Sequence, residues 1–505
     1  MLACLRTATV LGVEAVTVHV EVDVSFGLPI FTMVGLPDTS VRESRDRVRS
    51  AIRNSGFEFP QDRVTVNLAP ADVRKAGTAF DLPIALGILA ASGVIARREA
   101  ADLILIGELS LDGSIHPSRG VLPIAVAARR NGVAGLLLPE PNAPEASVVG
   151  GLKVFPVSRL AEAVGLLNDP DRRPSTIHPI ERTVPSFDPD LADVRGQTLA
   201  RRALEVAAAG GHHLLLVGPP GSGKTMMARR LPGLLPAMTF EEALEASAIH
   251  SVAGTLPPGA GLLQVRPFRA PHHTISDVAL AGGGPIPRPG EISLAHHGVL
   301  FLDEMPEFQR RSLEVLRQPL EAGSIVVARA ARTVEFPARF TLVGSMNPCP
   351  CGFRGHPRRE CRCTSPQVQR YVSRLSGPLR DRLDLIVDVP ALTADTLADA
   401  APGESSAIVR ERVATARRVQ SERLAGHTVR VNAGMSGEAV RRTCALDGAA
   451  QRLLLDAATK LALSARAYDR ILKVARTIAD LAGADGLDAA HVAEALQFRF
   501  DVDAG

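Results

Sequence analysis

The sequence predicts a multidomain α/β protein with three domains. A chain of 505 residues, 46% hydrophobic and 22% charged, is too long for one hydrophobic core. Near its middle, a glycine-rich loop follows a short apolar run, which is typical of a parallel sheet that binds phosphate. Beyond residue 391 the strand-like runs stop and helical spacing continues. We therefore expect an α+β domain, then an α/β nucleotide-binding core, then a helical domain.

The first segment, residues 1–167, mixes the two kinds of periodicity. Residues 16–22 alternate as a half-buried strand does, whereas residues 41–54 and 80–92 show helical spacing. We therefore expect an α+β domain here. Residues 168–190 are rich in proline, arginine and aspartate and carry no apolar period, so we interpret them as a linker.

The remainder of the chain divides into a segment with strands and a segment without them. Residues 191–390 contain short continuous apolar runs, as expected of strands buried in a parallel sheet, at 214–217, 299–302, 340–343 and 385–389. Residues 391–505 show helical spacing over 408–424, 449–463, 467–481 and 489–498, which predicts a small helical domain.

The glycine-rich loop lies directly after the run 214–217 and before a helical stretch. Its glycines let backbone amides converge on phosphate oxygens, and the positive end of the following helix dipole is directed at them. A lysine reaches the phosphates and a threonine binds Mg²⁺. The alternative is a plain glycine turn between strand and helix. The predicted nucleotide site consists of Gly218, Pro219, Pro220, Gly221, Ser222, Gly223, Lys224 and Thr225.

Polar residues follow two of the other predicted strands. Asp303 and Glu304 come after the run 299–302, where one carboxylate can order Mg²⁺ and the other can polarise an attacking water. Asn347 follows the run 340–343 and could hold that water or the γ-phosphate. It could equally be a turn residue before a proline.

Arg382 precedes the last predicted strand of the core. From there it could supply positive charge to the nucleotide of a neighbouring subunit. A surface salt bridge is the other interpretation.

Four of the six cysteines lie in one short segment. Cys349 and Cys351 form one C-x-C pair and Cys361 and Cys363 form another, which is enough for one tetrahedral Zn²⁺. In a cytosolic chain such clustering favours a metal over disulfides. Because C-x-C is less usual than C-x-x-C, free thiols or a redox-formed disulfide stay open as alternatives.

Two histidine pairs precede the predicted strand that ends at the acidic pair. His272 and His273 lie in a basic, proline-flanked stretch that could line the pore of a ring and touch a threaded strand through its phosphates. A second metal or catalytic site is disfavoured there because Asp277 is the one carboxylate nearby. His296 and His297 are interpreted as structural.

The composition limits partners and location. A net charge of +3 permits nucleic acid without requiring it. Without tryptophan and with 4% aromatic residues, a base-stacking platform is disfavoured, so DNA contacts are expected to be mostly to phosphates. The N-terminus does not resemble a signal peptide, and no apolar run approaches the roughly 18 residues of a membrane span. We expect a cytoplasmic protein with no membrane partner.

Several stretches resemble the YifB/ComM family, a bacterial branch of the AAA+ ATPases related to the motor subunit of magnesium chelatase. They are residues 268–274, 282–284, 289–296 and 301–304, and the resemblance extends to 35–38, 64–70 and 475–481. It implies that the loop is the Walker A motif for ATP and Mg²⁺, Asp303 and Glu304 the Walker B pair, and Asn347 the first sensor.

The resemblance also implies how subunits cooperate. Arg382 matches the arginine finger, and Arg466 matches the second sensor, with Arg470 one turn later as the alternative. A finger that acts on a neighbouring subunit requires a ring, and the family implies a homo-hexamer. The C-terminal helices would form the lid of each AAA+ core.

The N-terminal segment is similar to the Lon-type protease fold. Ala79 takes the nucleophile position and Leu122 the base position, so the pair needed for nucleophilic catalysis is missing. We expect a binding or assembly role instead. Lys75, Arg74 and Arg119 could face a DNA backbone or form a solvated loop.

The resemblance implies an ATP-hydrolysing ring motor that acts on single-stranded or branched DNA. Its activity would be branch migration or helicase movement in recombination or natural transformation. The alternative is a chelatase-like ATPase that remodels a partner subunit. An ATP-dependent protease is disfavoured by Ala79 and Leu122.

Overall fold

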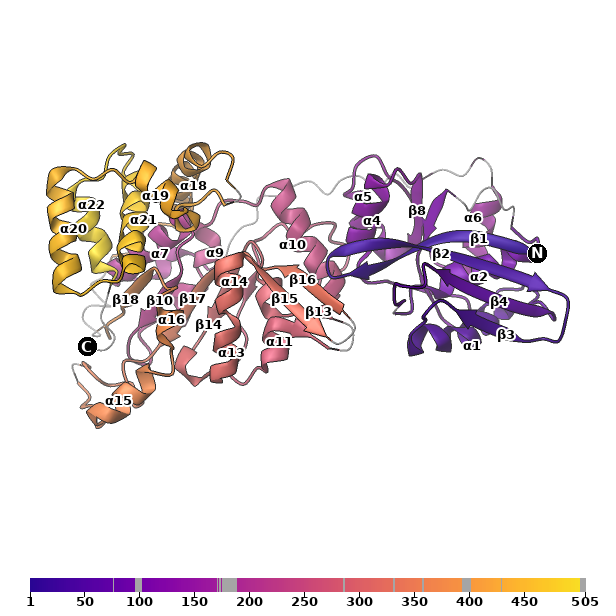
Figure 1. Cartoon of the computed structure of the whole chain (residues 1–505), viewed down its shortest axis with the longest axis horizontal. Helices are drawn as coiled ribbons and strands as arrows, with labels where there is room; N and C mark the ends of the chain where they lie inside the picture. Colours follow the sequence, from indigo (N-terminus) through magenta and orange to yellow (C-terminus); the bar gives the residue numbers. More distant parts are fainter. Residues whose placement is uncertain are drawn as a thin grey trace.

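The computed structural model describes residues 1–505 except 76, 96–101, 170, 172–173, 175–188, 285–286, 330–331, 357, 393–400, 428 and 500–505. The chain is elongated, with a mixed sheet at the N-terminal end, a parallel sheet in the middle and helices at the other end (Figure 1). This mixed α/β architecture around a parallel sheet confirms the predicted fold class at that level.

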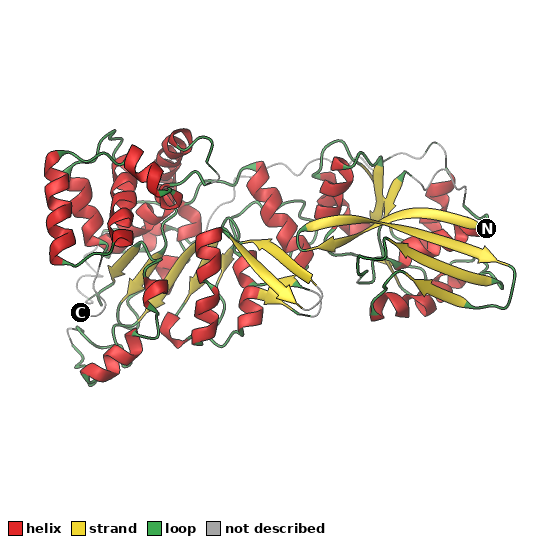
Figure 2. Ribbon diagram, viewed as in Figure 1, coloured by secondary structure: helices red, strands yellow, loops and turns green. Residues whose placement is uncertain are grey.

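The N-terminal part is a seven-stranded mixed sheet in the order β3-β4-β2-β1-β5-β8-β9. Helices α1, α2 and α6 pack on one face, and α4 and α5 pack on the other (Figure 2). A separate pair is formed by β6 and β7. The strands are β1 (Leu2–Leu11), β2 (Glu14–Ser25), β3 (Phe31–Val34), β4 (Arg63–Ala69), β5 (Leu103–Leu105), β6 (Glu108–Leu109), β7 (Ile115–His116), β8 (Gly135–Pro139) and β9 (Lys153–Val157). The helices are α1 (Thr39–Asn54), α2 (Asp81–Ala91), α4 (Val121–Arg130), α5 (Ala143–Ser147) and α6 (Leu160–Asn168).

The central part is a five-stranded parallel sheet in the order β11-β14-β17-β10-β18. Four of its strands match the predicted apolar runs: β10 (Leu214–Val217), β14 (Val299–Leu302), β17 (Thr341–Met346) and β18 (Leu385–Asp388). The edge strand β11 (Phe268–Arg269) was not predicted because two residues carry no period. Two hairpins lie beside the sheet: β12 (Gly282–Gly283) with β13 (Arg288–Pro289), and β15 (Ser324–Arg329) with β16 (Arg332–Pro337).

The helices of the central part are mostly short. Among the longer ones, α10 begins with a capping box between Thr239 and Glu242 and ends at Gly254, which adopts the left-handed conformation. The helices are α7 (Thr198–Gly210), α8 (Lys224–Ala228), α9 (Leu231–Leu234), α10 (Phe240–Ala253), α11 (Asp277–Ala281), α12 (Glu291–Leu294), α13 (Arg310–Val315), α14 (Arg317–Ala322), α15 (Ser365–Val372) and α16 (Gly377–Arg380).

The C-terminal helices pack directly on the central part. They are α18 (Ser406–Arg423), α19 (Gly437–Thr443), α20 (Gly448–Lys460), α21 (Ala465–Leu481) and α22 (Ala489–Gln497). One hydrophobic core contains residues of these helices, of α7 and of one face of the central sheet. The boundary at residue 390 therefore stays a prediction.

The N-terminal part touches the central part at two places. Val13, in the turn between β1 and β2, packs against the core of the central part, and a Cβ on Gly12 would lie 2.7 Å from Cγ1 of Val334 in β16. The amide of Gly120 donates to the carbonyl of Ser251 in α10 at 3.1 Å.

The predicted linker, 168–190, lies almost wholly outside the described residues. Across the described part of the chain, no helix combines the length and apolarity that crossing a membrane requires.

Candidate functional site

The glycine-rich loop joins β10 to helix α8 at the carboxyl edge of the central sheet. Gly221 and Gly223 have φ angles of +80° and +93°, which residues with a Cβ rarely adopt. A Cβ on Gly218 would lie 2.2 Å from the carbonyl oxygen of Val389, the residue that follows β18. Helix α8 begins at Lys224, so its first amides have no partner within the helix. The loop is thus a cradle of backbone donors that fits an anion.

The ammonium of Lys224 lies inside this loop. Its Nζ donates to the carbonyl oxygens of Gly218 at 2.7 Å and Pro219 at 2.9 Å, and to Oδ1 of Asn347 at 3.3 Å. The residue is 8% exposed. Burial lowers the pKa of the ammonium to about 8, although the acidic residues after β14 oppose this shift. A buried cation whose hydrogen bonds go to neutral oxygens is well placed for an anionic ligand.

Thr225 and Asp303 meet beside the lysine. Oγ1 of Thr225 donates to Oδ2 of Asp303 at 2.7 Å, and the hydroxyl of Ser345 donates to Oδ1 of Asp303. Hydroxyl and carboxylate oxygens are suitable ligands for Mg²⁺. The residues present therefore fit a magnesium ion next to the phosphate cradle. Sequence reasoning missed Ser345, although it stands two residues before Asn347 and the strand period places both on one face.

Glu304 lies at the same edge with a more exposed carboxylate. Its backbone has a φ of +51°, and its amide donates to Oγ of Ser345 at 3.1 Å. Its Oε2 lies 3.9 Å from Nδ1 of His273, whose ring is 4.1 Å from that of His272. The histidine pair after β11 therefore lies beside the predicted Walker B pair, a proximity that the sequence did not reveal.

Arg382 is bonded within its own chain, to residues outside the glycine-rich loop. Its guanidinium is 8% exposed and bonds to Glu321 and to the carbonyl of Pro378. The salt bridge that the sequence left open as an alternative is therefore present. A role toward a neighbouring subunit remains a proposal.

The two candidates for the second sensor have different environments. Arg466 is exposed in the first turn of α21. Nε of Arg470 lies 3.3 Å from Oδ1 of the buried Asp384, which also accepts the amide of His213 at 3.1 Å. Burial alone would raise the pKa of the Asp384 carboxyl, but His212 and nearby positive charges lower it well below its usual value. Arg470 is thus held by its own chain, whereas Arg466 faces solvent.

The four clustered cysteines converge on one point next to the nucleotide loop. Sγ of Cys349 lies 3.4 Å from that of Cys351 and 3.6 Å from that of Cys361, and the latter two sulfurs are 3.6 Å apart. All four sulfurs, including that of Cys363, lie within 4.8 Å of one another. A Zn²⁺ bonded to thiolates at about 2.3 Å needs sulfurs about 3.8 Å apart. The cluster therefore fits one tetrahedral ion.

A second group of metal-type side chains is a hydrogen-bonded set. Oε2 of Glu245 lies 3.2 Å from Nε2 of His296 and 2.8 Å from Nε2 of His297. Nδ1 of His296 accepts the amide of Arg339 at 2.9 Å, so the proton of the neutral ring is on Nε2 and is donated to the carboxylate. The nitrogen that would face a metal therefore carries a proton.

The N-terminal part contradicts one expectation. Lys75 is fully buried, and its Nζ donates to the carbonyl of Pro70. It therefore cannot face a DNA backbone or belong to a solvated loop. Arg74 and Arg119 are exposed, and Arg119 lies against Gly254 of the central part.

Comparisons with known proteins find relatives along the whole chain. Three family models match in order: Subunit ChlI of Mg-chelatase over residues 20–142, Magnesium chelatase, subunit ChlI over 190–397, and Magnesium chelatase, subunit ChlI C-terminal over 403–499. Competence protein ComM of Haemophilus influenzae is 46% identical over 505 residues, which cover 99% of this chain and 97% of the relative. The uncharacterized protein YifB of Escherichia coli is 44% identical over 506 residues with the same coverage. The magnesium-chelatase 38 kDa subunit of Rhodobacter capsulatus is 28% identical over 152 residues, 27% of this chain and 43% of the relative.

Proposed function

We propose that this chain, which belongs to the YifB/ComM family of AAA+ ATPases, is an ATP-hydrolysing ring motor that acts on DNA. Its activity would be branch migration or helicase movement along single-stranded or branched DNA. The pathway would be recombination or natural transformation, which the name of the relative, a competence protein, supports.

The observation that carries the proposal is the meeting of Lys224, Thr225, Asp303 and Asn347 at one edge of the central sheet. Lys224 and the loop amides would bind the phosphates of ATP, and Thr225 and Asp303 would hold Mg²⁺. When bound, that ion neutralises the charge that develops during phosphoryl transfer. Asn347 would orient the attacking water.

Glu304 and Arg382 would complete the machinery. The exposed carboxylate of Glu304 can polarise the water from the acidic edge of the site. Arg382, which contacts Glu321 within its own chain, would act on the nucleotide of the next subunit in a homo-hexamer. Arg466, exposed at the start of α21, would serve as the second sensor.

The proposal is tested by ATP turnover of the full chain with forked, duplex and single-stranded DNA at low salt. We expect DNA, and forks most, to stimulate turnover. Lys224→Ala should lower turnover by about a hundredfold or more, the scale seen when a positioned charge donor is removed. Lys153→Ala, on the exposed edge strand β9, is the matched control. A protein that hydrolyses ATP but neither binds nor responds to DNA would contradict the DNA motor.

A chelatase-like ATPase that remodels a partner subunit is the second candidate. The three matching ChlI family models favour it. Affinity capture with the intact chain discriminates the two functions. A chelatase-type partner recovered without nucleic acid would support remodelling, whereas co-purifying DNA together with DNA-stimulated turnover would support the DNA motor.

A further inference from the structure

We propose that the four cysteines hold one Zn²⁺ and that this zinc knuckle positions the phosphate-binding loop and Asn347, so that ATP turnover depends on the metal. The knuckle is defined as residues 349–356 and 358–363. The coupling to turnover rests on the proposed ATPase function, whereas the metal site does not.

The ligand geometry supports a metal over the other states of the thiols. A disulfide joins two sulfurs, but here all four sulfurs converge, and the cysteines are free. The amide of Arg354 lies 3.4 Å from Sγ of Cys349, which is fully buried. Such amide–sulfur bonds stabilise thiolate ligands as the outer shell of a metal site. Four thiolates so close together repel one another unless a cation neutralises them.

The knuckle touches the nucleotide loop directly. Gly352, at a φ of +83°, lies so near the loop that a Cβ there would be 2.6 Å from Cδ and 2.8 Å from Cγ of Pro220. The same Cβ would be 3.8 Å from Cγ of Asn347. The backbone at Gly352, directly after the ligand Cys351, therefore packs against Pro220 and Asn347, two residues of the candidate site.

The described residues of the knuckle make few contacts that would fix its shape without a metal. Phe353, its one large apolar side chain, packs on His356 and Arg359 of the same segment. Cys349 is buried in the core of the central part, and the other three cysteines pack against that core. These contacts offset only part of the conformational entropy that closing such a polar segment costs. Metal binding supplies that free energy in small metal-binding segments. Without the ion, Pro220 and Asn347 would lose the surface against which they pack.

The first experiment measures metal content and turnover on the full chain. We expect one zinc per chain by mass spectrometry of the metals. Removing zinc with a thiol-directed mercurial and a chelator should lower ATP turnover about tenfold or more, and added thiol with Zn²⁺ should restore it. Circular dichroism should show that the helices persist. Cys361→Ser should act like metal removal, and Cys4→Ser, on an exposed cysteine outside the cluster, should not.

The second experiment tests the contact without touching a ligand. Gly352→Ala should keep its zinc but lower turnover about tenfold, because the new methyl group displaces Pro220. Gly355→Ala is the matched control: its φ is +74°, and nothing lies within 4 Å of the added Cβ. Both variants place alanine at a similar positive φ, so a difference between them reports the contact.

The outcomes separate the two proposals. A reduced protein that purifies without metal and gains none from Zn²⁺ would overturn the site. Zinc-free protein with wild-type turnover, or equal turnover of the two glycine variants, would overturn the coupling. A zinc-loaded wild type that hydrolyses no ATP would overturn the ATPase function, and the coupling with it, while the metal site would stand.

Discussion

Buried and half-buried histidines are one group of residues through which acid acts on this molecule. His213, His250 and His296 each have a lowered pKa because burial disfavours the charged ring. In the unfolded chain each ring would have a pKa of about 6.5. Below that pH the unfolded state binds more protons than the folded state, so the free energy of unfolding falls as the pH falls.

His296 offers a direct test, because its pKa is lowered to about 4. Between pH 8 and pH 5.5 this one ring should reduce the free energy of unfolding by about 1.4 kcal/mol. His296→Gln removes the titrating group, so the melting temperature of that variant should depend less on pH. His427→Gln, at an exposed position, is the control. Equal pH dependence of wild type and His296→Gln would refute the assignment.

The sequence predicts residues of the site when their spacing is local. The loop 218–225 is a contiguous motif, and Asp303 follows its strand at once, so both could be located. Gly352 could not, because it reaches the site through the fold of the knuckle. Ser345 was overlooked, although the strand period places it on the face of Asn347. Lys75 was misjudged because burial of a lysine depends on a tertiary acceptor, here the carbonyl of Pro70.

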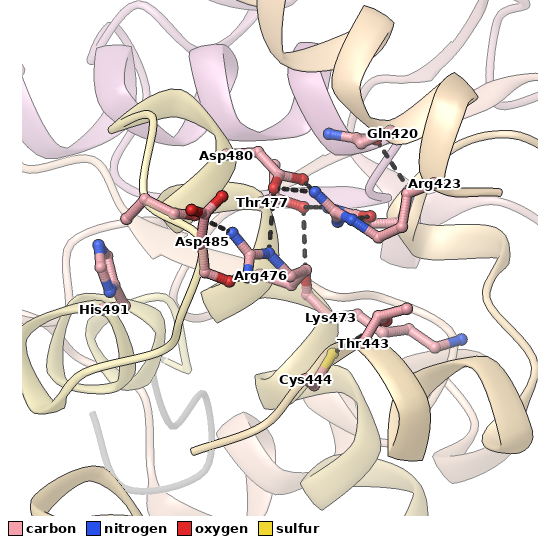
Figure 3. A network of polar contacts seen from close by, with 12 residues as sticks. Gln420, Arg423, Thr443, Cys444, Lys473, Arg476, Thr477, Asp480, Asp485 and His491 are labelled. Atoms are coloured by element: carbon pink, nitrogen blue, oxygen red, sulfur yellow. Dashed lines mark hydrogen bonds and ion pairs between the residues drawn. The ribbon is translucent and has the colours of Figure 1, made fainter. Parts of the chain in front are cut away.

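At the scale of elements, α21 connects the C-terminal helices to the central part. Asp480 accepts bonds from Arg423, from Arg476 at 3.0 Å and from Asn432 at 2.8 Å (Figure 3). One turn earlier, Thr477 bonds to His212, which precedes β10, at 2.8 Å. Asp480 thus links α21 to α18, and Thr477 links α21 to the segment before β10.

Removing the shared carboxylate should be costly. Asp480→Ala leaves the guanidinium of Arg476, which is 2% exposed, without its acidic partner. We expect a loss of about 3–5 kcal/mol, as for other broken buried ion pairs. Thermal unfolding followed by circular dichroism measures it. Asp469→Ala, exposed on the same helix, should change the melting temperature little. Similar shifts for both variants would show that the network contributes nothing beyond surface charge.

Among the C-terminal helices, the longer ones were predictable. The long helices α18, α20, α21 and α22 appear within a few residues of the predicted spans. The seven-residue helix α19 and the strand β11 are too short to show a period, so they were missed.

At the scale of the whole molecule, the proposed ring makes each site a shared one. A site would take Glu304 from one chain and Arg382 from its neighbour. Arg382→Ala and Glu304→Gln proteins should each be inactive alone. Mixed in equal amounts, they should regain about a quarter of wild-type turnover, because one boundary in four pairs two intact residues.

The control for this mixture is a chain that carries both changes. Mixed with Arg382→Ala, the double variant should restore nothing, since no boundary then combines both intact residues. Turnover of the first mixture that stays at the sum of its components would exclude shared sites.

The order of the three parts was evident from the sequence, but their contacts were not. Period and composition report how a segment packs within itself. They do not report that Val13 packs against the core of the central part, or that the amide of Gly120 bonds to Ser251.

The reach of the β1–β2 turn matters for anyone who divides this protein into fragments. A chain shortened to begin at residue 191 would lack Val13, which packs against the core of the central part, and Gly12, which lies beside Val334 of β16. The apolar surface that they cover would then be exposed to water. Such a fragment would tend to aggregate. The resulting loss of activity would be mistaken for evidence that the N-terminal part takes part in catalysis. Point changes in the intact chain are the sounder route to dissecting it.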